Sequence, residues 1–459
     1  MALPVLDPGP DLTPAGPALL PLDAGEQYRF AFAMEACVGC HSCEAACAEQ
    51  NGLPPGTAWR RVGEIEGGAF PHTRRLHLSM SCNHCLEPAC LTGCPTGAYV
   101  KLGNGVVAHR ADECIGCQYC TWNCPYSVPV FQPDRRIVTK CDLCLPRLEQ
   151  GLEPACVGAC PTQAISVETV NVAAWREDHG AGDAPLLPSA DLTLSTTRFE
   201  VPDGLPLETF GGSEWALRPE DPHWPLIWLT LLTQAAVGAS LTAGDRAGRL
   251  AAAVLAGVAL AASLLHLGRP LFAWKALRNL RRSWLSREVA LFGAYGALAA
   301  MAVADPAAAP VAAVVGAAGV YASGRLYMVP GRPAWCTPLT LARFGATALA
   351  LGGLVTGQRA VAVAGVAGGL AVFAANLGRL ARGRRIEWWG TVRLALRRFR
   401  RLSALGAVCS VGGIVVTAVG GPLALALGLV ATGELTGRYL FYVTVVPLDM
   451  PGSFHRSLA

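Results

Sequence analysis

The sequence is short of charge for its length, and the charge that it has is unevenly spread. Asp, Glu, Lys and Arg make up only 15% of the 459 residues, aromatic residues make up 7%, and the mean hydropathy is +0.36. There is no acidic or basic tail, so nothing in the composition indicates a nucleic-acid partner. The average hides two unlike halves, because residues 30–166 are charged and cysteine-rich whereas residues 224–446 are dominated by Ala, Leu, Val and Gly.

Basic residues are absent from the start of the chain, where the first is Arg29. A secretory signal needs a basic segment and a twin-arginine signal needs paired arginines, so we expect neither. Residues 1–29 are predicted to be an unstructured leader that docks on a partner. A molybdopterin domain and a flavin motif are also lacking, so we expect the chain to be the non-catalytic part of an oxidoreductase complex.

Cysteine, in contrast, is abundant, and 16 of the 18 cysteines fall into four runs of four. The runs are Cys37-Cys40-Cys43-Cys47, Cys82-Cys85-Cys90-Cys94, Cys114-Cys117-Cys120-Cys124 and Cys141-Cys144-Cys156-Cys160. The first and third read C-x2-C-x2-C-x3-C, and a proline follows the last cysteine of three runs. In this spacing three thiolates on one tight loop bind one cubane cluster, and the fourth binds a neighbouring one. Sixteen ligands suffice for four [4Fe-4S] clusters, which predicts an electron wire.

Disulfide bonds and zinc sites are two alternative interpretations of the cysteines, and the spacing favours both less. A disulfide framework is typical of short secreted chains. Zinc sites use paired C-x2-C knuckles rather than runs of four that end in Cys-Pro. Cys336 and Cys409 lie far from the runs in apolar surroundings, and we interpret them as small buried hydrophobic residues.

The second half of the chain is predicted to cross a membrane. About 20 apolar residues are needed for one helical crossing, and Ala251–Leu265 and Ala360–Ala375 are apolar on every face, unlike soluble helices. The eight predicted spans are 224–243, 249–267, 288–304, 307–324, 338–356, 359–378, 402–420 and 422–446. The frequent Gly and Ala residues suit close packing of helices in lipid.

The distribution of basic residues predicts the orientation. Loops on the N-terminal side of the spans carry 17 Lys and Arg residues, within 268–287, 325–332 and 379–401, and the opposite loops carry three. The positive-inside rule therefore puts the cysteine-rich half in the cytoplasm. The expected location is the cytoplasmic membrane of a bacterium or archaeon, with the chain crossing it several times.

Few ionisable residues lie at membrane depth, and such residues are functional candidates because they are costly in lipid. They are His266, Glu288, Arg325, Arg343, Glu434 and Arg438. His266 and Glu288 flank a basic loop, and a His beside a carboxylate is what a quinone site needs to accept protons. The alternative for these two is that they reach lipid headgroups. Glu434 and Arg438 are four residues apart and could pair along one helical face as a structural ion pair.

Two resemblances follow from these motifs. The segments CVGCHSCEAAC, SCNHCLEPACLTGCPTGA, DECIGCQYCTWNCPY and TKCDLC…PACVGACPTQAI resemble the four-cluster subunit of the dimethyl sulfoxide reductase family of molybdopterin oxidoreductases. The segments HWPLIWLTLLTQAAVGA, LLHLGRP, LSREVALFG, GRLYMVP and TGELTGRYLFY resemble the membrane anchor subunit of the same enzymes. Two subunits that are usually separate are therefore predicted to be fused in one chain.

The resemblance implies a fold and a pairing of ligands. The fold is an α+β ferredoxin-like double dicluster domain followed by an all-α eight-helix transmembrane bundle. Each cube would take three cysteines of one run and one of another: Cys37, Cys40 and Cys43 with Cys160; Cys141, Cys144 and Cys156 with Cys47; Cys82, Cys85 and Cys90 with Cys124; Cys114, Cys117 and Cys120 with Cys94. The predicted divisions are a leader (1–29), the four-cluster domain (30–167), a linker or wrap (168–222), the anchor (223–446) and a C-terminal tail (447–459).

The resemblance also implies a quinol site at His266 and Glu288, with Arg325, Glu434 and Arg438 as further candidates for binding the quinone. The expected function is oxidation of menaquinol or ubiquinol and delivery of electrons to a separate catalytic subunit that carries molybdopterin. Family members usually place their clusters in the periplasm, whereas the charge pattern here predicts the cytoplasm. Two alternatives stay open: reverse flow from a donor such as formate into quinone, and an iron–sulfur sensor or scaffold without quinone turnover.

Overall fold

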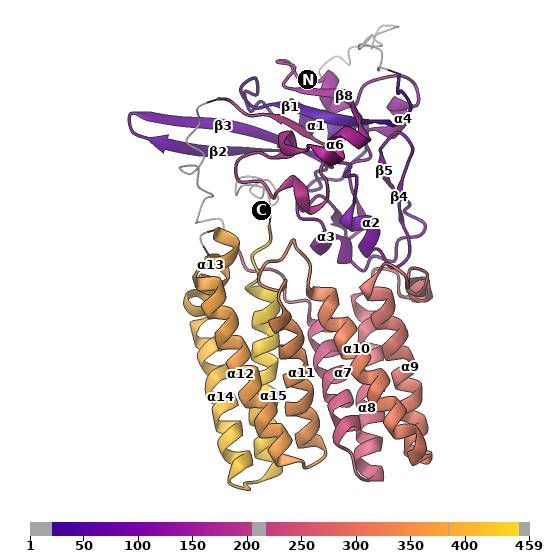
Figure 1. Ribbon diagram of the computed structural model, residues 1–459, viewed down its shortest axis with the longest axis vertical. Coiled ribbons are helices and arrows are strands. Elements are labelled where there is room, and N and C mark those ends of the chain that lie inside the picture. The colour runs from indigo at the N-terminus through magenta and orange to yellow at the C-terminus, as the bar shows by residue number, and fades with distance from the viewer. Residues whose placement is uncertain (1–20, 204–216, 384, 449–459) are drawn as a thin grey trace, which may run out of the picture.

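The computed structural model describes residues 21–203, 217–383 and 385–448, which form a cysteine-rich head on one end of a bundle of long helices (Figure 1). The head runs from strand β1 (Glu26–Ala33) to strand β9 (Arg198–Glu200), and the bundle runs from helix α7 (Trp224–Thr242) to helix α15 (Leu423–Val443). The chain therefore completes its soluble part before it enters the bundle, as the two unlike halves of the sequence predict.

A three-stranded sheet closes the head on the side away from the bundle. Its strand order is β8 (Ile165–Asn171), β1, β9. Strand β1 pairs antiparallel with β8, so that Phe30 lies opposite Val167, and parallel with β9, so that Phe32 lies beside Phe199. Phe30, Phe32 and Phe199 are buried on the inner side of the sheet. The segment after the fourth cysteine run thus returns to cover the start of the head.

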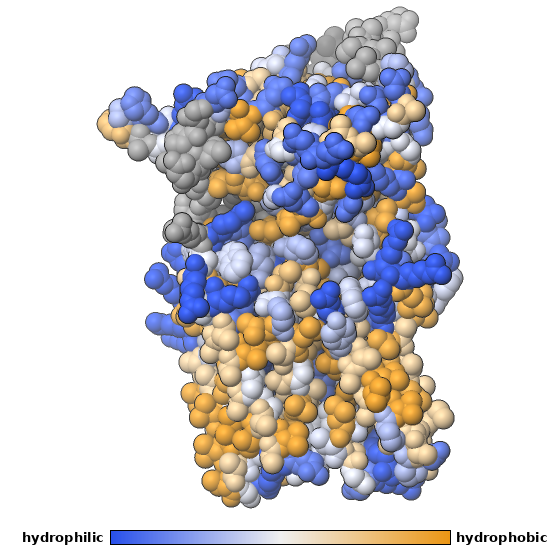
Figure 2. All heavy atoms as spheres, in the orientation of Figure 1, coloured by the Kyte–Doolittle hydropathy of each residue, from blue (hydrophilic) through white to orange (hydrophobic). Residues whose placement is uncertain are grey.

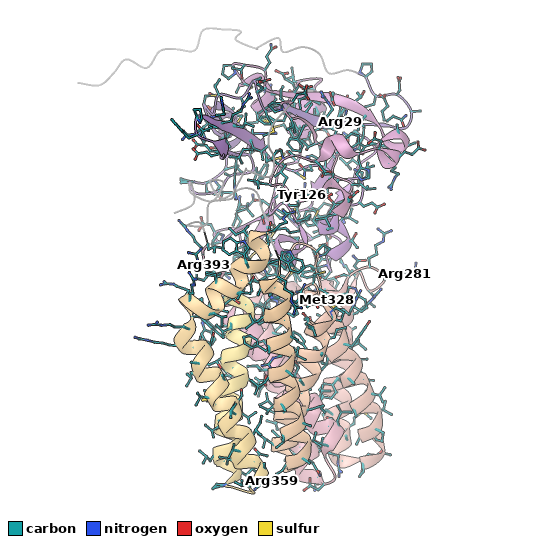
Figure 3. The ribbon with its side chains drawn as sticks, turned by 60° about the vertical axis from the view of Figure 1, so that its left-hand side comes forward. Arg29, Tyr126, Arg281, Met328, Arg359 and Arg393 are labelled. Carbon is teal, nitrogen blue, oxygen red and sulfur yellow. The ribbon has the colours of Figure 1, made fainter. Side chains whose placement is uncertain are left out.

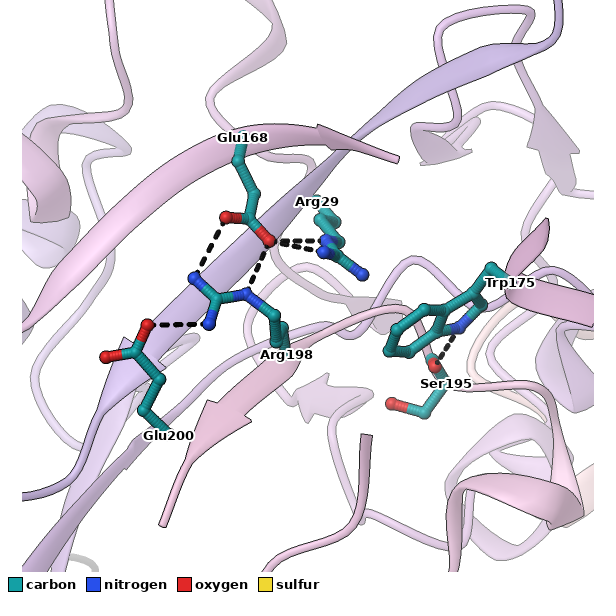
Figure 4. Close-up of polar contacts among 6 residues, drawn as sticks. All are labelled: Arg29, Glu168, Trp175, Ser195, Arg198 and Glu200. Carbon is teal, nitrogen blue, oxygen red and sulfur yellow. Dashed lines mark hydrogen bonds and ion pairs between the residues drawn. The ribbon is translucent and has the colours of Figure 1, made fainter. Parts of the chain in front are cut away.

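An ion-pair network holds this returning segment to β1 (Figure 4). Glu168 of β8 accepts a 2.6 Å hydrogen bond from Arg29 of β1 and bonds of 2.8 and 3.0 Å from Arg198 of β9. Arg198 also donates to Glu200 at 2.6 Å. The Arg29 guanidinium lies 4.6 Å from the ring centroid of Trp175, whose indole N–H donates to the Ser195 carbonyl. One bidentate carboxylate therefore links all three strands.

Short hairpins and helices fill the space between the sheet and the bundle. The hairpins are β2 (Arg61–Ala69) with β3 (His72–Met80), β4 (Tyr99–Lys101) with β5 (Val107–His109), and β6 (Val130–Gln132) with β7 (Ile137–Thr139). The first hairpin is the longest and projects sideways from the head (Figure 1). The helices are α1 (Ser42–Gln50), α2 (Ala89–Gly93), α3 (Tyr119–Asn123), α4 (Leu145–Leu148), α5 (Ala155–Gly158) and α6 (Val172–Glu177).

The bundle contains the predicted membrane region. Its long helices are α7, α8 (Arg246–Ser263), α9 (Trp284–Ala304), α10 (Ala309–Tyr327), α11 (Pro338–Val355), α12 (Arg359–Ala381), α14 (Arg400–Ala418) and α15, with the shorter α13 (Ile386–Arg393) between α12 and α14. Seven of them, among the described residues, are long and apolar enough to cross a membrane, and α15 is not in that set. The prediction of a multi-pass helical region is confirmed, whereas the count of eight spans stays a prediction.

The surface of the bundle is an apolar belt with a hydrophilic band on the side of the head (Figure 2). Arg281 and Arg393 lie in this band, whereas Arg359 lies at the opposite end of the helices (Figure 3). The basic loops therefore share one end of the bundle with the head.

Helices α7 and α11 approach closely because both carry glycine at their contact. A Cβ atom added to Gly238 would lie 1.8 Å from the carbonyl oxygen of Ala348, and one added to Gly352 would lie 2.1 Å from the carbonyl carbon of Gly238. In lipid the hydrophobic effect does not drive helices together, so their association depends on van der Waals packing. Small residues allow the two backbones to approach closely enough for this packing. It also joins α7–α10 to the remainder of the bundle.

We predict that Gly238→Ala lowers the melting temperature of the detergent-solubilised protein. The added methyl group overpacks this contact, which typically lowers the free energy of unfolding by about 1–3 kcal/mol. The matched control is Gly257→Ala in α8, where a Cβ would meet no atom within 4 Å. That change should be neutral or stabilise the helix by up to about 1 kcal/mol. Equal melting temperatures for the two variants would contradict this account of the α7–α11 contact.

Candidate functional site

The four cysteine runs fold into tight loops. His41 and Gln118 occupy the same place in the first and third runs, directly after the second cysteine, and both are left-handed, with φ of 61° and 59°. His84 in the second run and Leu143 in the fourth are also left-handed. Left-handed residues turn the backbone sharply, so successive thiols can face one enclosed volume. Of the 16 cysteines in the runs, ten are buried, five are half-buried and Cys40 is exposed.

The fourth cysteine of each run lies beside the thiols of a different run. Burial raises the pKa of Cys47 to about 12, and the thiolates that add to this effect are Cys156 and Cys144 of the fourth run. In the same way burial raises the pKa of Cys117 to about 12, with Cys94 of the second run as its strongest thiolate neighbour.

The fourth cysteines of the third and fourth runs, Cys124 and Cys160, also lie beside thiols of a different run. Cys85 has its pKa raised to about 12 by burial and then by Cys82 and Cys124, and burial raises the pKa of Cys37, with Cys160 adding to it. Because iron binds the deprotonated form, loading these sites must release protons. These neighbours agree with the exchange of ligands that the resemblance implies.

The donor set suits a multi-iron group. None of the 18 cysteines is in a disulfide, and all lie in the described part of the chain. Among the described residues no three His, Cys, Asp or Glu side chains are close enough to share one metal ion. In a cubane cluster the four thiolates bind four different irons, so they are spaced more widely than the ligands of a single ion.

Two buried cations lie among the thiols, and neither has a carboxylate partner among the described residues. The first is Arg60, which is 2% exposed and donates to the hydroxyls of Ser79 and Ser81 at 3.0 and 2.9 Å. Burial disfavours its charge, but thiolates of the first and fourth runs more than offset this and raise its pKa.

Lys140 is the second buried cation. It is 3% exposed and donates to the carbonyl oxygens of Val107 and Cys141. Burial lowers its pKa, and the thiolates of Cys82, Cys90 and Cys141 offset this and raise it overall. A buried cation is costly unless an anion compensates it, so both residues fit thiolate-ligated clusters, which are anionic.

The loops that carry the second and third runs rest directly on the bundle. The connection between α8 and α9 donates to their backbone carbonyls: Ser283 to Gly93 at 2.7 Å, Asn279 to Cys94 at 2.8 Å and Lys275 to Asp112 at 3.0 Å. The Arg269 amide also donates to Ile115, and Lys275 and Arg278 form ion pairs with Glu113. The basic loop predicted from the sequence therefore holds the head in place.

A cavity of about 120 Å³ lies at this contact, and we call it the interface cavity. From the head it is lined by Ile115, Cys117, Tyr119 and Trp122, and from the bundle by residues of α7, α8, α9 and α10 and of the loop between α8 and α9. Among the bundle residues are His266, Glu288 and Tyr327. An engineered apolar cavity of about 150 Å³ holds benzene, and the interface cavity is of the same order of size.

The two predicted proton-accepting residues thus line the same cavity as Cys117, a predicted cluster ligand. Glu288 lies in the second turn of α9 and is 6% exposed. His266 ends the helical segment after α8, and its Nδ1 atom is buried without a hydrogen-bond partner among the described residues. The Nδ1 atom of His266 is therefore available to a molecule in the cavity.

The other three candidate residues lie outside this lining. The Arg325 guanidinium lies 5.2 Å from the ring centroid of Trp284. Glu434 pairs with Arg343 of α11 at 3.0 Å rather than with Arg438, and Arg438 donates to Gln234 of α7 at 2.6 Å. These contacts join α7, α11 and α15, and they give Glu434 and Arg438 structural partners in the bundle core.

Aromatic side chains also belong to the site, and the sequence motifs did not indicate them. Tyr119 donates its hydroxyl to the Leu326 carbonyl at 2.8 Å, and Tyr327 is hydrogen-bonded to Tyr442. Trp122 is 7% exposed and its ring centroid lies 5.3 Å from that of Trp335. The cost of burying charge in lipid indicates only charged residues and His as candidates at membrane depth. The signal that does point to Tyr327 is its position at the end of an apolar span, where a phenol hydroxyl meets the head.

Comparison with known proteins identifies both halves. Residues 74–170 match the family described as 4Fe-4S dicluster domain, and residues 220–382 match the family described as DMSO reductase anchor subunit. The expectations of an iron–sulfur domain and of a membrane anchor are therefore confirmed.

Individual relatives match the head. A subunit of the anaerobic dimethyl sulfoxide reductase of Haemophilus influenzae is 38% identical over 177 residues, which is 37% of this sequence and 86% of the relative. The probable anaerobic dimethyl sulfoxide reductase subunit YnfG of Escherichia coli is 39% identical over 177 residues, covering 36% and 85%. A subunit of the sulfite dehydrogenase of Allochromatium vinosum is 40% identical over 153 residues, covering 28% and 64%.

Proposed function

Since this protein belongs to the dimethyl sulfoxide reductase family, as its iron–sulfur subunit fused to its anchor subunit, we propose that it oxidises quinol at the membrane and passes the electrons to a catalytic partner. The quinol is menaquinol or ubiquinol, and the partner carries molybdopterin. The observation that carries the proposal is the interface cavity, which is lined by Cys117 on one side and by His266 and Glu288 on the other.

The residues of the cavity suit quinol chemistry. Oxidation of a quinol releases two protons and two electrons, so the site needs a proton acceptor at each hydroxyl. A neutral His266 can accept one proton at its free ring nitrogen, and the Glu288 carboxylate can accept the other. Apolar side chains of α7, α8 and α9 supply the remaining walls and exclude bulk water from the ring.

We propose four clusters. Each is held by three cysteines of one run and by the fourth cysteine of the run that lies beside it in the head. When bound, the clusters supply one-electron transfer between the cavity and the partner. Because Cys117 lines the cavity, we assign the membrane end of the series to the proposed set of Cys114, Cys117, Cys120 and Cys94. Lys140 lies between thiols of the second and fourth runs, and Arg60 between those of the fourth and first. The order from the membrane is therefore third, second, fourth and first run.

The far end of this series supports the position of the partner. Cys40 is the exposed cysteine of the first run, and Val38 beside it is 62% exposed. We propose that the catalytic subunit covers this loop and takes electrons there. The fold proposed for the whole chain is a double dicluster head on eight membrane spans, with α15 as the eighth.

The compartment follows from the basic loops. They share the head's end of the bundle (Figure 3), and the positive-inside rule puts this end in the cytoplasm. Quinol would then release its protons on the side where the partner consumes them. The proposed reaction is therefore electroneutral.

We predict that Glu288→Gln lowers quinol-dependent electron transfer by about 100-fold, because a proton-accepting group typically contributes that much or more. His266→Ala should act in the same direction. The measurement is quinol oxidation by membranes with an artificial electron acceptor, together with iron content. The matched control is Glu434→Gln, which changes a buried carboxylate outside the cavity. The proposed site is wrong if both cavity variants keep wild-type rates, or if only Glu434→Gln loses activity with its iron intact.

Iron content tests the number and pairing of the clusters. The wild-type chain should hold about 16 irons, since each cubane cluster has four. A double variant within one proposed cluster, Cys94→Ala with Cys117→Ala, should lose one cluster and keep about 12 irons. A double variant within one run, Cys90→Ala with Cys94→Ala, should lose two clusters and keep about eight. If each run instead held its own cluster, the first double variant would keep the lower iron content and the second the higher.

A reporter fusion tests the orientation. Alkaline phosphatase, which is active only in the periplasm, should be inactive when fused after Ala459, because α15 ends beside the head. The same reporter inserted after Gly357, in the turn between α11 and α12 at the opposite end, should be active. The reverse pattern would put the clusters in the periplasm.

A further inference from the structure

A second hollow lies at the head-side end of the bundle, away from the interface cavity. It measures about 730 Å³ and opens to the outside between the first turn of α7, the start of α14 and the last turns of α15. Leu435 and Thr436 of α15 line it, and Trp224, Phe399 and Tyr439 contribute aromatic rings. We call it the arginine groove, because Arg397, Arg398, Arg400 and Arg401 also line it.

The four arginines of the groove carry uncompensated charge. All are exposed, and none has a side-chain hydrogen bond or ion pair with any residue in the described part of the chain. Some other basic residues at this end do have a carboxylate partner, as Lys275 has in Glu113 and Arg385 in Glu387. Four like charges within five residues repel one another unless an anion lies between them.

The backbone adds to this positive field. Arg400 and Arg401 are the first residues of α14, where the helix dipole is positive and disfavours cations. The preceding residues Leu394–Arg398 form a π-helical turn, a distortion that occurs often at functional sites. Four arginines therefore lie at the N-terminus of α14, an end whose dipole already favours an anion.

The depth of the groove indicates the kind of anion. Trp224, at the start of α7, is 46% exposed, and its ring centroid lies 5.5 Å from that of Tyr439. Trp and Tyr at the end of membrane helices mark the level of lipid headgroups. Below the arginines the outer faces of α7 and α14 are apolar, with Trp228 44% and Leu405 46% exposed. A ligand with a phosphate at one end and hydrocarbon at the other matches both parts.

We propose that the arginine groove is a binding site for an anionic phospholipid, with its phosphate among the four guanidinium groups and an acyl chain against Leu435. Arginine binds phosphate through paired N–H donors, and basic pockets between membrane helices suit anionic headgroups. The bound lipid brackets α7, α14 and α15. It therefore ties the last two helices of the anchor to the helix that follows the head.

The test uses the full chain in nanodiscs of zwitterionic phosphatidylcholine that contain a small fraction of phosphatidylglycerol. Native mass spectrometry measures how much phosphatidylglycerol each protein retains. Arg398→Gln with Arg401→Gln should weaken retention about thirtyfold, since each basic residue near a headgroup contributes about fivefold. Iron content and melting temperature are measured in parallel, so that a variant that fails to fold is recognised and replaced by the single variant Arg401→Gln.

The matched control is Arg281→Gln with Arg282→Gln, two exposed arginines at the same end of the bundle outside the groove. The proposal requires that this control retains wild-type phosphatidylglycerol. Equal losses in both double variants would show a general basic belt instead of a site and would overturn it. Displacement of the lipid by millimolar inorganic phosphate would also overturn it, because the hydrocarbon part would then contribute nothing.

Discussion

The position of the head on the bundle depends on hydrogen bonds from one membrane loop to the backbone of the cluster loops. The rate of electron tunnelling falls steeply with distance, so the proposed function requires the cluster nearest the membrane to be held at a constant short distance from the cavity. Asn279 and Ser283 meet this requirement by donating hydrogen bonds to the carbonyls of Cys94, a proposed ligand of that cluster, and of the adjacent Gly93. Side chains that bind these carbonyls directly leave the ligand loops little freedom to shift. The basic loop on which the predicted orientation rests is thus also the loop that holds the head on the bundle.

Charge inside the head imposes a second condition. Arg60 and Lys140 are almost fully buried, and neither has a carboxylate partner in the part of the chain that the structure describes. Removing the anion from such a pair typically costs about 3–5 kcal/mol, because one charge is left uncompensated. A head without clusters would carry this cost at both residues. Insertion of the clusters and folding of the head are therefore coupled, as metal binding and folding are in other small metal-rich domains.

Local features of the fold could be predicted from the sequence, and contacts between distant segments could not. Ligand runs and membrane spans depend on spacing within about 20 residues, so counting along the chain finds them. Glu434 illustrates the limit: spacing of four favoured Arg438 as its partner, yet it pairs with Arg343 of another helix. Trp122 and Tyr119 likewise read as parts of a cysteine run, and only the docked head brings them to the cavity. The partners of Glu434 and Arg438 likewise depend on how α7, α11 and α15 pack against one another, which the spacing of residues along one helix does not reveal.

The fusion of two subunits changes what this interface has to achieve. Separate proteins must offset about 4–15 kcal/mol of lost translational and rotational freedom when they associate. Here the chain continues from head to bundle, so that cost is largely absent, and the effective concentration of the two parts is high. Hydrogen bonds contribute only about 0.5–1.5 kcal/mol each, yet their directions are specific. An interface of polar contacts to carbonyls can therefore fix the register of the head without having to supply its affinity.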